Sequence, residues 1–361
     1  MLGRMGRPVA PQPPLTSFTG RARGTALGAL TALATLTLGA ALTLGAAACS
    51  SDDTSSATTT PKDSTTTVAR PAASTVSALL ALDRPIVLAH AGGDNTSPHD
   101  TPYGFNTSAA LGVDALDMDV QLSSDGVLVV QHDATVDRTT EATGDVASMT
   151  YDQLHALDAG YWFTETCTCK DQPESAYLYR GVRTGAKPPP KGAEPDDFAI
   201  TSFERIATDH PDFVLNVEIK GKAPAAIPAA AELARLTSTL HLTDRLVVTS
   251  FDDAVADAYS AAAPGVQITP GLGASTAYVL NGTLPPAGQK ILQLPPSYEN
   301  IEVVTPAMVA KTHADGLVLW VWPNDAEWET AEGYTKLLDM GVDGLNAADP
   351  GTAVKVVRAR S

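Results

Sequence analysis

Short apolar runs alternate with longer Ala-rich segments between residues 84 and 350. Runs rich in Val, Ile and Leu predict strands, and segments with apolar residues at helical spacing predict helices. The predicted strands cover residues 84–90, 113–122, 126–133, 212–221, 244–251, 266–271, 290–296, 317–325 and 342–350. The predicted helices cover residues 149–160, 201–211, 225–240, 252–265, 305–316 and 326–341.

Repeated strand–helix alternation predicts an α/β fold, with a parallel sheet covered by helices. About eight strands favour a closed (β/α)8 TIM barrel over an open doubly wound sheet. The run 126–133 follows the turn signal SSDG, so we interpret it as a hairpin-like excursion from the strand before it. The helix 149–160 is expected to begin after Thr150 as N-cap and to stop at Gly160. No GxGxxG follows a strand, so dinucleotide binding has no support.

Polar residues that are costly to bury without partners lie at or near the carboxyl ends of the predicted strands. They are His90, Asp117, Asp119, Glu218 and Lys220. In an α/β barrel these ends converge on one face, where the active site is built. The sequence therefore predicts that residues far apart along the chain meet in one pocket.

The carboxylates predict a cation site. Asp117 and Asp119 point to the same side of one strand, because side chains alternate along it, and Glu218 would add a third oxygen ligand. An all-oxygen ligand set suits a hard cation, Ca²⁺ or Mg²⁺, better than zinc. The alternative is that these carboxylates pair with Arg or Lys, or lie on the surface.

Two histidines suit acid–base work on a phosphodiester. His90 and His132 would move protons near neutral pH, one taking the proton of the attacking oxygen and the other protonating the leaving oxygen. The cation and Lys220 would stabilise charge on the phosphoryl group. We interpret the remaining histidines as surface or core residues; they are His99, His155, His210, His241 and His313.

The N-terminal segment predicts export. A positive lead with four arginines is followed by an uncharged run from Thr25 to Ala48, which reads as a signal peptide over residues 1–48. The run ends in small residues before Cys49, which resembles a bacterial lipobox in which the Cys is lipidated, although Ala46 stands where Leu is usual. An uncleaved membrane anchor is the alternative.

Residues 49–77 are predicted to be the lipidated Cys followed by a disordered Ser/Thr-rich tether, because large apolar residues are almost absent there. The expected location is therefore the outer face of the cytoplasmic membrane, with the lipid on Cys49 as anchor. The remaining residues, 78–361, amount to about 280, the size of one α/β barrel.

The net charge of -17 argues against nucleic acid as a partner, since a phosphate backbone needs a basic face. It leaves an anionic substrate open, because a bound divalent cation inverts the local field. The sequence does not indicate an oligomeric state.

The chain resembles the glycerophosphodiester phosphodiesterase family from about Pro85 to the C-terminus. IVLAHAGG is similar to the family's opening His-Arg-Gly strand, and residues 112–160 resemble its most characteristic block. LNVEIKG, VVTSF, WVWPND and GVDGLNAADP resemble later family motifs. The resemblance implies a TIM barrel and hydrolysis of glycerophosphodiester or lysophospholipid-type substrates. It also implies metal ligands at Asp117, Asp119 and Glu218, catalytic histidines at His90 and His132, and a phosphate-facing Lys220.

Four departures from the family pattern lie in the expected pocket. Ala91 stands where the family has Arg, and His99-Asp100-Thr101 stands near the usual Glu-Asn-Thr. Asp117 replaces the commoner Glu. The strand of Trp322, a candidate substrate-binding residue, is shortened to Trp-Pro-Asn. These changes leave the substrate and the metal less defined than the reaction class.

Residues 164–197 form an insertion after the second strand region. We hypothesise that it caps the pocket and that Arg180 or Arg183 replaces the missing Arg; a solvated surface loop is the alternative. Cys167 and Cys169 are candidates for a small-ring disulfide or a pair of free thiols.

Three functions remain at this point. The leading one is metal-dependent hydrolysis to an alcohol and glycerol phosphate. A phospholipase D-like lyase would use the same parts, with an internal hydroxyl attacking to give a cyclic phosphate. A non-catalytic lipoprotein that binds lipid or cell-wall polymer is the third, favoured by the lost Arg and opposed by the retained histidines, carboxylates and Lys220.

Overall fold

The computed structural model describes residues 71–299 and 301–360. The chain divides into residues 1–63 and 64–361, and only the second unit contains described residues. The expected signal peptide 1–48, the lipidation site Cys49 and the tether up to residue 70 lie outside the described part. Among the described residues, no helix combines the length and the apolar character that a membrane crossing requires.

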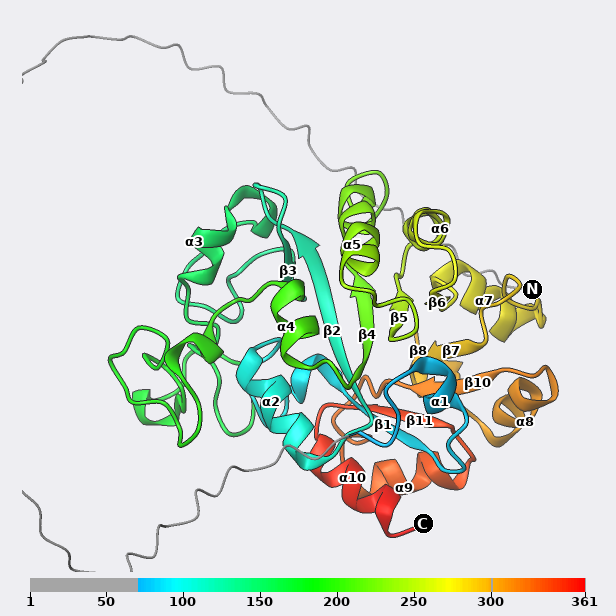
Figure 1. Ribbon diagram of the computed structural model, residues 1–361. Coiled ribbons are helices and arrows are strands. Elements are labelled where there is room, and N and C mark those ends of the chain that lie inside the picture. Colours follow the sequence, from blue (N-terminus) through cyan, green and yellow to red (C-terminus); the bar gives the residue numbers. More distant parts are fainter. Residues whose placement is uncertain (1–70, 300, 361) are drawn as a thin grey trace, which may run out of the picture. The chain divides into compact units, whose positions relative to one another are not determined.

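A parallel sheet forms the centre of the domain (Figure 1). Its eight parallel strands run in the spatial order β6-β5-β4-β2-β1-β11-β10-β7, and every neighbouring pair is parallel. The strands are β1 (Ile86–Ala89), β2 (Ala115–Leu122), β4 (Val214–Ile219), β5 (Leu246–Thr249), β6 (Gln267–Ile268), β7 (Ile291–Leu294), β10 (Val318–Val321) and β11 (Gly344–Ala347). The predicted (β/α)8 TIM barrel is confirmed, with β6 and β7 at the two ends of the pairing path.

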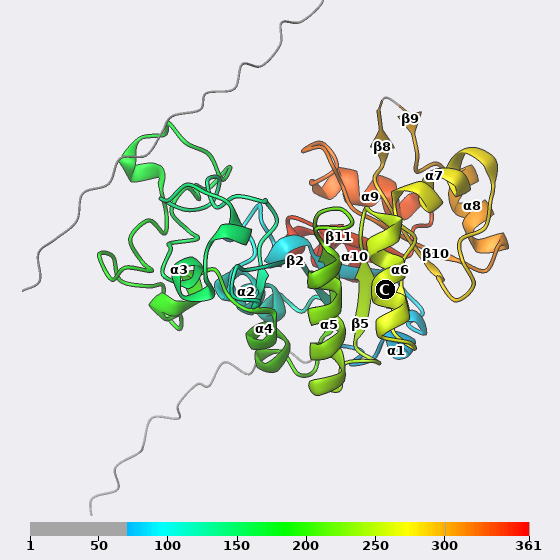
Figure 2. The same cartoon turned by 90° about the horizontal axis from the view of Figure 1, so that it is seen from above.

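Helices surround the strands (Figures 1 and 2). They are α2 (Pro102–Leu111), α4 (Phe203–Asp209), α5 (Ile227–Thr239), α6 (Asp253–Ala262), α7 (Leu272–Asn281), α8 (Pro306–Ala314), α9 (Ala331–Asp339) and α10 (Pro350–Arg358). Side-chain N-caps begin several of them, including Thr101, Ser202, Asp252 and Thr305. Such caps satisfy amide groups that the first turn leaves without partners.

Helix α3 (Tyr151–His155) begins as predicted and ends early. Thr150 and Gln153 form a capping box at its start. The predicted stop at Gly160 is wrong, because the chain leaves the helix after His155 and turns around Asp158. The carboxylate of Asp158 accepts hydrogen bonds from the amides of Gly160 and Gly181, which ties this turn to the insertion.

A short helix, α1 (Val76–Leu80), lies against the amino-terminal end of the barrel. Ala73, Val76 and Leu79 are buried in one cluster with barrel residues such as Leu88 and Trp320. The packed domain therefore begins before the boundary expected at residue 78, because the last residues of the predicted tether supply apolar side chains to the barrel floor.

Two smaller features flank the barrel. β3 (Leu128–Val130) pairs antiparallel with β2, which confirms the hairpin-like excursion at 126–133. β8 (Ser297–Tyr298) and β9 (Ile301–Glu302) form a separate hairpin after β7. Short 3-10 turns occur at η1 (His90–Gly92), η2 (Val146–Ser148), η3 (Glu174–Ala176) and η4 (Pro195–Phe198).

Residues 164–197, the predicted insertion, lie between α3 and α4 and include η3. It packs through aromatic rings, with Tyr179 against Phe163 and Phe198, and Tyr103 of α2 stacked on Phe198. Cys167 and Cys169 within it are joined by a disulfide.

Candidate active site

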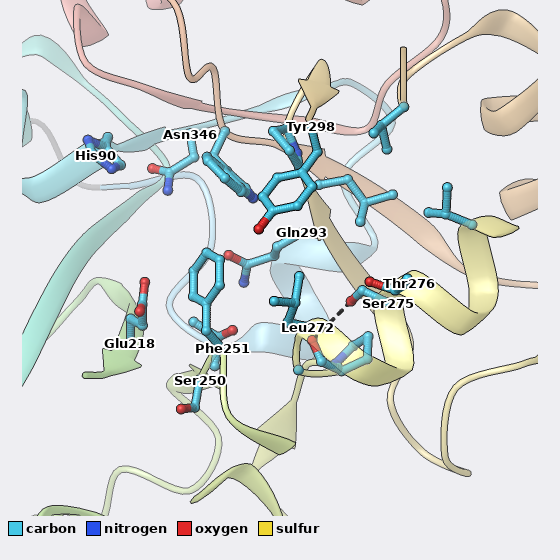
Figure 3. A pocket seen from close by; sticks show the side chains of 18 of the residues that line it. His90, Glu218, Ser250, Phe251, Leu272, Ser275, Thr276, Gln293, Tyr298 and Asn346 are labelled. Atoms are coloured by element: carbon cyan, nitrogen blue, oxygen red, sulfur yellow. Dashed lines mark hydrogen bonds between the residues drawn. The ribbon is translucent and has the colours of Figure 1, made fainter. Parts of the chain in front are cut away.

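One pocket of about 480 Å³ opens at the carboxyl ends of the barrel strands. All six residues expected from the strand ends and the family resemblance line it: His90, Asp117, Asp119, His132, Glu218 and Lys220. Trp322 also lines it, with its ring against Phe251. Figure 3 shows His90 and Glu218 on one side of the pocket, away from the α7 residues Leu272, Ser275 and Thr276. The sequence thus predicted which side chains meet.

Strand register brings two of the carboxylates together. Asp119 on β2 is the register partner of Glu218 on β4, so both carboxylates leave adjacent strands at the same level. The Nζ atom of Lys220 lies 3.3 Å from Oδ1 of Asp119 and 2.8 Å from Oε1 of Glu218. Burial, together with the charge of Asp119, raises the pKa of Glu218 to about 7 despite Lys220. Negative charge at this end of the pocket is therefore only partly compensated by the protein.

Asp117 is set deeper on β2. The side-chain amide of Asn216, its register partner on β4, donates a hydrogen bond to Oδ1. The backbone amide of Ala91 donates to Oδ2 over 3.4 Å. Burial raises the pKa of Asp117. These contacts fix the carboxylate beside the turn that carries His90.

Each pocket histidine is held by an aspartate. His90 Nδ1 lies 3.0 Å from Oδ1 of Asp94, and His132 Nδ1 lies 2.6 Å from Oδ1 of Asp133. Since Nδ1 is engaged in both rings, Nε2 is the nitrogen for proton exchange with a substrate. Burial opposes the charged form of His90, but nearby carboxylates outweigh it and raise its pKa well above the usual value. The hydrogen bond to Asp133 raises the pKa of His132.

A third histidine stands between these two. The ring centroid of His99 lies 6.3 Å from that of His90 and 5.6 Å from that of His132. Its Nδ1 lies 3.1 Å from Oδ2 of Asp100, whose carboxylate is buried and has no hydrogen-bond partner on Oδ1. The sequence analysis assigned His99 to the surface or the core. The available signal was that His99-Asp100-Thr101 stands where the family has Glu-Asn-Thr.

Two sets of groups can hold a cation. Among residues 71–299 and 301–360, His99, Asp100 and Asp119 offer ligand atoms within 4.8 Å of one another. The expected set of Asp117, Asp119 and Glu218 lines the same pocket, and the Nζ atom of Lys220 contacts the last two. Both sets share Asp119. Buried carboxylates that lack full compensation by Lys or Arg fit a divalent cation.

Arg138 lies at the two-histidine end and was missed by sequence reasoning. Its guanidinium donates to both oxygens of Asp133, over 2.7 Å and 3.0 Å. It is therefore the arginine that acts on His132 through Asp133. The residue lies within HDATVDRTT, six positions after His132, which was the signal available.

Ala91, which stands where the family has Arg, lies in a tight turn. Ala91 is buried with φ 44°, and Gly92 and Gly93 follow at φ 77° and 88°. Positive φ favours Gly and is costly for a residue with Cβ. The turn places His90 at the pocket while Ala91 sends no polar side chain into it.

The hypothesis about Arg180 and Arg183 is wrong in this structure. The guanidinium of Arg180 stacks on the rings of Tyr177, Tyr161 and Trp162, with centroid distances of 3.5, 4.2 and 4.6 Å. Arg183 donates to the backbone oxygen of His155 over 3.1 Å and 2.8 Å. No residue of the insertion lines the pocket, so the insertion does not cap it. Arg180 also pairs with Glu174, and Arg183 lies 3.6 Å from Asp196, so both arginines are held by groups outside the pocket.

Comparison with known proteins agrees with this geometry. Residues 90–352 match the Glycerophosphoryl diester phosphodiesterase family. A glycerophosphodiester phosphodiesterase of Caldanaerobacter subterraneus subsp. tengcongensis is 29% identical over 76% of this chain and 98% of its own. One from Bacillus subtilis is 32% identical over 41% of this chain and 48% of its own.

Solved structures share the fold. The glycerophosphoryl diester phosphodiesterase domain of a Mycobacterium tuberculosis protein superimposes with a TM-score of 0.58 and 21% identity, covering 76% of this chain and 99% of that one. An Oleispira antarctica phosphodiesterase, in complex with the product sn-glycerol-3-phosphate, gives a TM-score of 0.53 and 18% identity over 76% and 97%. With the family match over most of the barrel, the chain belongs to the glycerophosphoryl diester phosphodiesterase family and is an enzyme of that family.

Proposed function

We propose that this chain hydrolyses glycerophosphodiesters to an alcohol and glycerol phosphate, in a reaction that depends on a divalent cation and two histidines. The observation that carries the proposal is the convergence of His90 and His132, each bound to an aspartate, with Asp119, Glu218 and Lys220 in one pocket. The product bound to the Oleispira antarctica relative supports glycerol phosphate as the product here.

The histidines would move the protons. One imidazole takes a proton from the attacking water as its oxygen bonds to phosphorus, and the other protonates the alcohol oxygen as the second P–O bond breaks. Their aspartate partners hold Nδ1, which directs Nε2 toward the reacting oxygens. Lys220 supplies positive charge to the phosphoryl oxygens from between Asp119 and Glu218.

The cation would be held by Asp117, Asp119 and Glu218, with Ca²⁺ or Mg²⁺ favoured by the all-oxygen ligand set. When bound, it supplies Lewis-acid stabilisation of charge on the phosphate. His99 and Asp100 lie beside this set and add a nitrogen and a further carboxylate near Asp119.

The test is steady-state turnover of glycerophosphocholine by the purified domain. His90→Ala and His132→Ala are each expected to lower kcat by roughly 10² to 10⁴, the usual contribution of a general acid or base. His313→Ala, at an exposed ring paired with Asp343, serves as the matched control and keeps its activity. Chelator should abolish turnover and added cation restore it. Turnover retained in both pocket variants contradicts the proposal.

We also propose that the chain is exported and anchored to the outer face of the cytoplasmic membrane through a lipid on Cys49. The support is the small-residue sequence before this Cys and the polar segment after it. This placement would bring the pocket near phosphodiesters released from the membrane.

A further inference from the structure

Three buried side chains beside the pocket histidines bring together possible metal ligands that the family pattern does not supply. His99, Asp100 and Asp119 each offer one ligand atom, and these atoms lie within 4.8 Å of one another. The three residues are only 6%, 2% and 5% exposed. His99 and Asp100 stand where the family has Glu and Asn, so the imidazole nitrogen is particular to this chain.

The carboxylate of Asp100 is buried without full compensation. Its Oδ1 atom has no hydrogen-bond partner, and its Oδ2 atom lies 3.1 Å from Nδ1 of His99. The two cationic side chains of this region, Lys220 and Arg138, pair with other carboxylates. Burying an ionised carboxylate without a matching charge is costly. A divalent cation would supply both the charge and a bond to the oxygen that lacks a partner.

The backbone already holds this carboxylate and the ring of His99 in place. The amide of Asp100 donates to the carbonyl oxygen of Ala91 over 2.9 Å, which ties it to the turn that carries His90. The φ angle of Asp100 is 56°, in the left-handed region that Asp adopts more readily than most residues. Thr101, the next residue, caps helix α2 with its side chain. Ligands on such a fixed turn need little rearrangement to bind an ion.

The spacing and the chemistry of the donors favour a transition cation. Nδ1 of His99 and Oδ2 of Asp100, at 3.1 Å, are spaced like two ligands of one ion with bonds of roughly 2.0–2.2 Å. The other ring nitrogen, Nε2, lies 4.0 Å from Oδ2 of Asp94, and a carboxylate in that place orients a ligating imidazole. An imidazole combined with carboxylates suits Zn²⁺ and similar cations, whereas Ca²⁺ and Mg²⁺ prefer oxygen ligands.

We propose that His99, Asp100 and Asp119 form a second cation site, which takes a divalent transition cation of the zinc class. Asp119 belongs both to this site and to the all-oxygen set with Asp117 and Glu218. Two cations at one site recur in enzymes that cleave phosphate esters. The inference rests on the proposed function for the reaction that the second cation serves, whereas binding of the cation is measured without substrate.

Co²⁺ is the probe, because its visible absorption reports the ligands and the geometry around the ion. The purified protein is saturated with Mg²⁺, to fill the all-oxygen set, and is then titrated with Co²⁺ while absorption and heat are recorded. The wild type should take up one further equivalent of Co²⁺, and His99→Gln and Asp100→Asn should each lose it. His313→Gln, at an exposed ring paired with Asp343, is the matched control and should bind Co²⁺ like the wild type.

Two results overturn the second site. One is Co²⁺ binding in His99→Gln with the same affinity and the same absorption as in the wild type. The other is displacement of all bound Co²⁺ by Mg²⁺, because the transition cation would then occupy only the all-oxygen set.

A double variant keeps the test independent of folding. His99→Glu combined with Asp100→Asn restores the residues that the family has at these two positions, and thermal unfolding monitors its stability. This variant should still bind Mg²⁺ in calorimetry and should lose the Co²⁺ site. Co²⁺ binding that survives the double change contradicts the inference.

Turnover separates this inference from the proposed function. A protein that binds Co²⁺ through His99 but hydrolyses no glycerophosphocholine supports the second site and contradicts the proposed function. A protein that hydrolyses glycerophosphocholine with Mg²⁺ and takes up no Co²⁺ through His99 overturns the second site and leaves the proposed function standing.

Discussion

At the scale of single residues, His132 is held through a chain of contacts. Asp133 binds Nδ1 of the ring, and Arg138 binds both oxygens of Asp133. Charge-assisted hydrogen bonds of this kind fix both the orientation of a ring and its basicity. In the proposed mechanism Asp133 and Arg138 are thus positioning residues, which would act on the substrate only through His132.

Asp133→Asn should lower kcat/KM roughly tenfold to a hundredfold, as loss of such a supporting partner usually does. The fall should appear mainly in kcat, since Asp133 does not line the pocket. Steady-state kinetics with glycerophosphocholine measure it, and Asp171→Asn in the exposed part of the insertion is the control. An unchanged kcat would mean that His132 needs no orienting partner.

His210 makes stability depend on pH. Burial lowers the pKa of this ring from its ordinary value of 6.5 to about 4. The charge of Asp209 raises the pKa and that of Arg245 lowers it. The unfolded chain therefore binds the proton first as pH falls. The stabilisation is present above about pH 6.5 and is lost progressively toward pH 4.

Between pH 7 and pH 5 this one group should remove roughly 2 kcal/mol from the free energy of unfolding. His210→Gln should lose correspondingly less over the same interval in urea titrations, whereas His241→Asn, at an exposed site, should behave like the wild type. Equal losses in wild type and His210→Gln would show that the ring is not buried in its neutral form.

At the scale of elements, the sequence predicted most strands and the residues at their ends. Strands such as β4, with Leu215 and Val217 buried and Glu218 near its end, carry a strong apolar pattern. Parallel topology then brings the carboxyl ends of these strands to one face of the barrel. Helix α7 and the β8–β9 hairpin were missed, because residues 264–300 mix Gly and Pro with isolated apolar side chains. The apolar side chains that these two elements bring to the pocket, such as Leu280 and Ile301, were therefore not predicted from the sequence pattern.

The insertion shows a different limit. The sequence did not predict the partners of Arg180, because these aromatic rings are brought together only by the folding of the insertion against the residues just before it. Composition places an arginine in a loop, and tertiary packing decides whether it faces a substrate or a ring.

Arg180→Ala should cost about 1–2 kcal/mol of stability, the range for a largely desolvated cation–π contact. Activity should remain within about twofold of wild type, since the insertion lies outside the pocket and changes away from such a site are usually near neutral. Thermal unfolding and kcat/KM are measured together, with Arg235→Ala, an exposed pair with Glu232, as the control. If the variant keeps its full stability but loses much of its kcat/KM, Arg180 contributes to the active site and the prediction is contradicted.

At the scale of the whole molecule, an acidic chain carries a pocket that is lined by charged residues such as Lys220 and by apolar residues such as Leu280. A net charge of -17 would repel an anionic substrate, so in the proposed mechanism Lys220, the histidines and the proposed cation would have to reverse the field locally. Removing the cation should therefore weaken both substrate binding and turnover.

The proposed anchor has its own test. In a bacterial host, wild-type protein should sediment with membranes and incorporate a fatty-acid label, while Cys49→Ser should do neither. Membrane association of Cys49→Ser without label would favour the uncleaved apolar run as anchor instead.

The most direct test of the central claim is phosphorus NMR of the purified domain with glycerophosphocholine and Ca²⁺ or Mg²⁺. The account predicts that the diester resonance is replaced by that of glycerol phosphate, that chelator stops the change, and that His90→Ala and His132→Ala show no conversion on the same time scale. A cyclic phosphate as the final product would contradict hydrolysis, and a diester signal that persists with every cation would contradict catalysis altogether.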